Sequence, residues 1–82
     1  MRGIIKGFGG SWGSGLAILI IEDSHGECHR IPCDNAPTVR ALSYLFPNVI
    51  GANHSVNVNA IMNKQIEYDI DDIGVLRWIA SA

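Results

Sequence analysis

Hydrophobic and polar residues alternate most clearly over residues 65–70, QIEYDI. Isoleucine and tyrosine occupy one face of this segment, and glutamine, glutamate and aspartate occupy the other. Successive side chains of a strand point to opposite faces of its sheet, so the pattern predicts a half-buried strand. The next four residues, DDIG at 71–74, predict a turn, and VLRWIA at 75–80 predicts a strand that pairs back on the first.

Three further strands are predicted in the N-terminal half of the chain. The first covers about residues 3–8. The second, over 16–23, begins with the uninterrupted apolar run LAILII, which is too short for a buried helix and predicts a strand buried on both faces. A turn at 23–27 leads to a third strand over 28–33, and Pro32 ends this strand or places it at a sheet edge because proline cannot donate to a ladder.

One helix is predicted over residues 34–47, DNAPTVRALSYLFP. Asp34 or Asn35 can cap its first turn, and Pro37 suits the position that follows. Arg40 is expected on the exposed side. The apolar stripe that faces the core consists of Val39, Leu42, Leu45 and Phe46.

These elements predict one mainly β domain spanning residues 1–82. Residues 48–63 add a weak alternation that fits a further strand, although asparagine is a poor strand former. Five or six short antiparallel strands with one short helix inserted mid-chain indicate a small barrel, whose closure removes free sheet edges. We expect an Sm-like or SH3-like barrel. An oligonucleotide-binding-type (OB-like) barrel is the alternative, because it has this order of strands and helix.

Two segments of the chain also resemble a known group of proteins. IPCDNAPTVRAL at 31–42 and IEYDIDDIGVL at 66–76 are similar to segments of small uncharacterised phage and environmental proteins with an Sm-like barrel. The resemblance implies a fold and a ring-like assembly. It implies no activity.

Composition adds an expectation about partners. Only 17% of the 82 residues are charged, whereas about 25% is typical of a globular domain. A short chain has proportionally more surface than a long one and should be the more polar of the two. We therefore expect a homo-oligomer, in which a second copy covers part of the apolar surface.

Charge and hydropathy disfavour several other partners. The net charge is −2, and the six basic residues are scattered along the chain, so nucleic acid is a partner that the sequence does not favour. The longest apolar run, Leu16 to Ile21, is far below the roughly 18 residues that span a membrane. Because the first ten residues hold no long apolar run either, we expect a cytoplasmic protein without a membrane partner.

The glycine-rich loop GFGGSWGSG at 7–15 invites a catalytic interpretation. Ser11 fits the pattern of a nucleophile elbow, but a helix must follow such a serine and here a strand is predicted. A phosphate-binding loop requires lysine after its last glycine, and Leu16 follows Gly15. The loop therefore predicts a bend in the sheet, and Trp12 within it either covers the barrel mouth or contacts a second subunit.

Four residues have side chains of the kinds that bind zinc: His25, Cys28, His29 and Cys33. Residues 28 and 33 lie on opposite faces of a strand and about 16 Å apart along it. We therefore expect no disulfide, no metal and no other cofactor, although His54 could act as a remote third ligand beside His25 and Cys28.

The sequence thus predicts a non-enzymatic structural or interaction module that self-associates. The alternative is a small barrel that binds nucleic acid or a small ligand. No nucleophile and base can be placed together, so no enzyme is predicted. If a site for interaction exists, we expect it at the loop and the start of the helix, where backbone N–H groups are free. Its candidate residues are Trp12, Asp34, Asn35 and Arg40.

Overall fold

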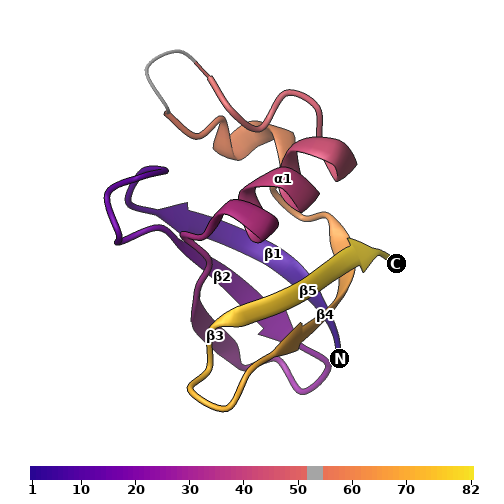
Figure 1. Ribbon diagram of the computed structural model, residues 1–82. Coiled ribbons are helices and arrows are strands. Elements are labelled where there is room, and N and C mark those ends of the chain that lie inside the picture. The colour runs from indigo at the N-terminus through magenta and orange to yellow at the C-terminus, as the bar shows by residue number, and fades with distance from the viewer. Residues whose placement is uncertain (52–54) are drawn as a thin grey trace.

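A computed structural model describes residues 1–51 and 55–82 (Figure 1). The described chain forms five strands, one α-helix and one turn of 3-10 helix. The elements in chain order are β1 (Arg2–Gly9), β2 (Ile18–Asp23), β3 (Cys28–Pro32), α1 (Ala36–Leu45), η2 (Val58–Ala60), β4 (Gln65–Ile70) and β5 (Leu76–Ser81).

The five strands form one antiparallel sheet in the order β3-β2-β1-β4-β5. The expected mainly β fold with one inserted helix is confirmed at this level. Barrel closure is not confirmed, because no ladder joins β3 to β5 among the described residues. The start of β5 has a different partner: Thr38 Oγ1 of α1 donates to the carbonyl oxygen of Leu76 at 3.3 Å. The helix occupies part of the edge that a β3–β5 ladder would need.

Strand β2 corrects the expectation of burial on both faces. Leu19 and Ile21 are fully buried, whereas Ile18 and Ile20 remain partly exposed on the opposite face. The neighbouring strand β1 explains the difference. It presents Ile5 to the core, but it places Gly7 and Gly9 beside Ile20 and Ile18 on the other side of the sheet. The apolar run therefore supplies both the core and a partly exposed outer surface.

Helix α1 forms over a shorter range than the sequence predicted. Asn35 is the cap, because its side-chain oxygen accepts a hydrogen bond from the backbone N–H of Thr38 at 3.0 Å. The predicted apolar stripe is confirmed: Leu42 is fully buried, and Val39, Leu45 and Phe46 pack against the core. The helix packs on β5 (Figure 1) and ends at Leu45, just before Pro47.

The segment between α1 and β4 differs most from its prediction. In place of the expected strand, the described part contains an isolated bridge between Ile50 and Val56 and the short helix η2. Ile61 anchors the segment in the core with no exposed surface. The β4–β5 hairpin, in contrast, forms as predicted, with an irregularity between Asp69 and Ile70. No helix within the described ranges is long and apolar enough to cross a membrane.

Candidate functional site

All four residues that the sequence singled out line one hollow of about 660 Å³. Trp12 comes from the glycine-rich loop, Asp34 and Asn35 precede α1, and Arg40 lies on its first turns. The fold brings the β1–β2 loop against the start of the helix, so residues more than 20 positions apart in sequence share one surface.

Asp34 holds the glycine-rich loop in place. One of its carboxylate oxygens accepts a hydrogen bond from the N–H of Gly13 at 2.9 Å, and the other accepts from Gly15 at 2.6 Å. Both glycines have positive φ, which only glycine adopts readily. The bond from Gly13 is the main reason why the pKa of Asp34 lies below its usual value. The carboxylate is therefore already engaged and acts as a brace for the hollow.

Trp12 forms the apolar wall of the hollow. Its side chain is only 6% exposed and meets Phe8 edge to face, with ring centroids 4.8 Å apart. Its indole Nε1 is buried and has no hydrogen-bond partner within residues 1–51 and 55–82. Of the two roles that the sequence left open, the structure favours the cover over the core, since little of the ring is free to contact a second subunit.

Arg40 brings a positive charge to the rim. It is exposed, and it takes part in no ion pair among the residues that the structure describes. The described lining of the hollow contains no thiol, hydroxyl or imidazole. The hollow thus offers an apolar wall, one cation and the carboxylate of Asp34, which the N–H groups of Gly13 and Gly15 already engage.

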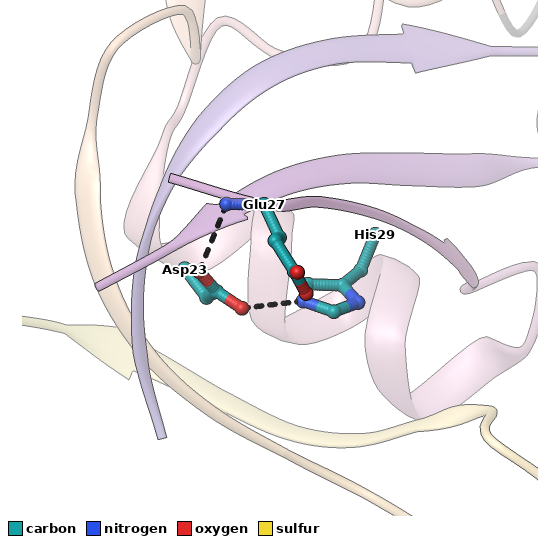
Figure 2. A group of neighbouring side chains, drawn as sticks. All are labelled: Asp23, Glu27 and His29. Carbon is teal, nitrogen blue, oxygen red and sulfur yellow. Dashed lines mark hydrogen bonds and ion pairs between the residues drawn. The ribbon is translucent and has the colours of Figure 1, made fainter. Parts of the chain in front are cut away.

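A second cluster, which the sequence did not predict, lies at the β2–β3 turn (Figure 2). It consists of Asp23, Glu27 and His29, whose potential ligand atoms all lie within 4.8 Å of one another. Asp23 Oδ2 lies 2.7 Å from His29 Nε2, and its Oδ1 accepts from the N–H groups of His25 and Glu27 at 2.8 and 3.0 Å. Pairing the two predicted strands around Gly26 would have placed these side chains together.

These hydrogen bonds give the cluster a structural role. The bond with His29 is the largest cause of the low pKa of Asp23, about 2 against an ordinary 3.8, and the bond from Glu27 adds to it. Asp23 also pairs with Glu27 through the backbone, which closes the hairpin. Two carboxylates and an imidazole suit a divalent metal chemically, but here the turn itself accounts for their arrangement.

The two cysteines of the zinc set that the sequence argued against lie in different environments. Cys28 is exposed, whereas Cys33 is buried, and burial raises the pKa of its thiol to about 12. Within the described ranges, neither belongs to a group of three ligands. His54, the remote third ligand of that interpretation, lies outside the described residues.

No family model, curated protein or solved structure matches the chain. The function proposed below follows from the fold and the side chains alone.

Proposed function

We propose that this protein is a non-enzymatic interaction module that self-associates through the outer face of strands β1 and β2. The observation that carries the proposal is the partial exposure of Ile18 and Ile20 on that face. Their neighbours Leu19 and Ile21 already supply the core. A second apolar face on the same strand has no role in the core of one copy, but it would be covered in a dimer.

Glycines make this face flat. A Cβ atom added to Gly7 would lie 3.3 Å from Ile20 Cδ1, and one added to Gly9 would lie 3.2 Å from Ile18 Cγ1. The two isoleucine side chains thus lie across strand β1, in the space that larger residues would fill. Flat apolar faces suit the packing of one sheet on another, at a spacing of about 10 Å.

Charges beside the patch suit a two-fold interface. Arg30 on β3 stands opposite Ile20, and Glu22 lies two residues further along β2. A two-fold axis repeats the same patch on both copies. Arg30 of one copy would then meet Glu22 of the other, which would fix the orientation of the pair.

Size-exclusion chromatography with light scattering tests the proposal, with absorbance recorded at two wavelengths to detect bound nucleic acid. We expect a nucleic-acid-free multimer. Ile20→Lys should convert it to a monomer, because a buried ammonium would face an apolar partner. Ile73→Lys is the matched control, since Ile73 is 83% exposed on the β4–β5 turn. A monomeric parent protein would refute self-association.

We also propose that the fold is OB-like rather than Sm-like or SH3-like. The order β3-β2-β1-β4-β5 supports this choice, together with a helix between β3 and β4. The resemblance to Sm-like proteins of phage and environmental origin stays a prediction. So do the absence of enzymatic activity and the cytoplasmic location.

Small-ligand binding is the second candidate, and the hollow beside Trp12 favours it. Trp12, whose buried indole N–H has no partner among the described residues, and Arg40 line the same space. Nucleic acid has less support, because β2 and β3 contain no phenylalanine, tyrosine or tryptophan on which bases could stack. A fragment screen that follows the indole N–H signal of Trp12 by NMR tests this candidate. A signal that no fragment shifts would reject it.

A further inference from the structure

Strand β5 is the last strand of the sheet, and its outer edge has no strand partner in the described chain. Ala82 N–H donates to the carbonyl oxygen of Gln65 at 3.2 Å, on the β4 side. Backbone groups of successive strand residues point alternately to the two sides. The N–H and C=O groups of Ser81 and Ile79 therefore point away from the sheet. Ser81 is exposed and free to pair with another extended chain, whereas Ile79 is only 6% exposed.

A groove of about 370 Å³ runs between this edge and helix α1, which lies alongside β5 (Figure 1). Its lining is almost entirely apolar apart from Arg40. The bond from Thr38 to Leu76 closes one end of the edge, and the groove opens beyond that point. The other residues that line it are Pro37, Ala41, Tyr44, Leu45, Ile79 and Ala80.

We propose that this groove binds an extended peptide segment of another protein, which adds as a sixth strand to the edge of β5. Free backbone donors and acceptors require an extended partner, since a helix has already used its own. An apolar groove beside the edge then accepts alternate side chains of the added strand. Tyr44 is 87% exposed at the rim and has no role in the core, which suits a contact residue.

Charge decides between a foreign segment and a second copy. Arg40 is the cation of the groove, so a carboxylate on the occupant would complement it. The two strands with free edges, Cys28–Pro32 and Leu76–Ser81, contain no aspartate or glutamate. A second copy that offered either edge would leave Arg40 without a partner. The chemistry therefore favours a peptide that combines apolar residues with acidic ones.

The probe is a fluorescein-labelled peptide with the sequence of residues 64–71, KQIEYDID, which alternates apolar and acidic residues. Its parent strand already occupies the inner edge of β5, so on this strand the free peptide can add only at the outer edge. The free edge of β3 is the competing position. We expect saturable binding by fluorescence anisotropy, with a dissociation constant below about 1 mM. NMR shifts should concentrate on α1 and β5. Absence of binding, or shifts centred on β1 or on the free edge of β3, would overturn the proposal.

Three variants with matched controls separate the contributions. Ser81→Pro removes an outward N–H and should weaken binding at least about tenfold, whereas Ala82→Pro removes an inward one and should not. Tyr44→Ala should weaken binding, and Ile73→Ala should leave it unchanged.

Arg40→Ala should weaken binding about two- to fivefold, as expected for an exposed ion pair. Arg30→Ala is its control, because that arginine is exposed on β3. Amide analogues of the peptide's acidic residues should bind the parent protein as weakly as the parent peptide binds Arg40→Ala. Equal effects of Arg40→Ala and Arg30→Ala would refute the assignment of Arg40.

The outcome is independent of self-association. Peptide binding by a monomer would support the groove and refute the multimer. A stable multimer that does not bind the peptide would support self-association and refute the groove. The Ile20→Lys variant should keep full peptide affinity, because Ile20 lies on β2, which β1 and β4 separate from β5 in the sheet.

Discussion

Gly3 shows how one missing side chain sets the packing of two strands. A Cβ atom at this position would meet Ile21 Cγ2 and would lie 2.9 Å from the carbonyl oxygen of Glu22. Backbone cannot move aside as a side chain can. The approach of β2 and of Tyr68 to β1 therefore depends on the glycine.

Gly3→Ala should lower the free energy of unfolding by about 1–3 kcal/mol, the usual effect of overpacking. Gly7→Ala is the control. Its new Cβ would lie 3.3 Å from Ile20 Cδ1, the movable end of that side chain, and no closer than 3.8 Å to the other atoms of Ile20. Alanine is also favoured over glycine in a strand. Urea denaturation measures both. Equal losses would show that the contact with Glu22 is not the cause.

The low pKa of Asp23 predicts how the stability of the fold changes in acid. Its pKa is about 2 in the folded protein against an ordinary 3.8, because His29 and backbone N–H groups stabilise the carboxylate. The folded state thus binds this proton less tightly than the unfolded state. The stabilisation is complete above about pH 4 and is lost as the pH falls towards about 2.

Asp23→Asn removes this titration. The variant should be less stable than the parent protein near pH 6, and the difference should shrink as the pH falls from about 4 to 2. Urea unfolding at several pH values measures it. A difference that stays constant over this range would contradict the role given to the carboxylate.

At the scale of elements, the cap of α1 links the first turn of the helix to Cys33, the residue that follows β3. Asn35 accepts from Thr38 N–H, and its own N–H donates to the carbonyl oxygen of Cys33. Asn35→Ala should cost about 1 kcal/mol of stability, or about 4–8 °C in Tm. Asn35→Asp keeps the hydrogen-bond acceptor and should retain most of this stability. Equal Tm values for Asn35→Ala and the parent protein would exclude a capping contribution.

Local patterns predicted the elements well where alternation, turns and caps agreed. The β4–β5 hairpin and the start of α1 are such places, because Gly74 and Asn35 mark their limits within a few residues. Residues 48–63 were predicted poorly. Alternation of valine with asparagine suggested a strand. The described part of this segment instead forms η2 and a single bridge, since burial of Ile61 outweighs a weak strand preference.

At the scale of the whole molecule, the sequence grouped four residues that the fold places around one hollow, but it did not predict that the sheet stays open among the described residues. Asp34 and Asn35 stood out because caps have local signals. Whether β3 pairs with β5 depends on contacts between residues far apart in sequence. Helix α1 competes with β3 for the edge of β5, because Thr38 donates a hydrogen bond to the carbonyl oxygen of Leu76. The groove beside β5 follows from the same contact, and no pattern along the sequence predicts it.

If copies cover each other's outer faces, thermal stability should depend on protein concentration. Unfolding would also separate the copies, so a hundredfold increase in concentration should raise Tm by several degrees. Differential scanning calorimetry measures it. The Ile20→Lys variant should show a constant Tm. A parent protein whose Tm does not change with concentration would argue against assembly.

The two cysteines can report how fast the fold opens, because a thiol reagent should reach them at different rates. Cys28 is exposed and should react with a thiol reagent at once, while Cys33 is buried with a pKa of about 12 and should react only after its surroundings separate. Cys33 sits between β3 and the cap of α1, and its N–H donates to the carbonyl oxygen of Ala17. The slow phase of labelling would therefore time the release of the helix from the sheet, without any engineered probe.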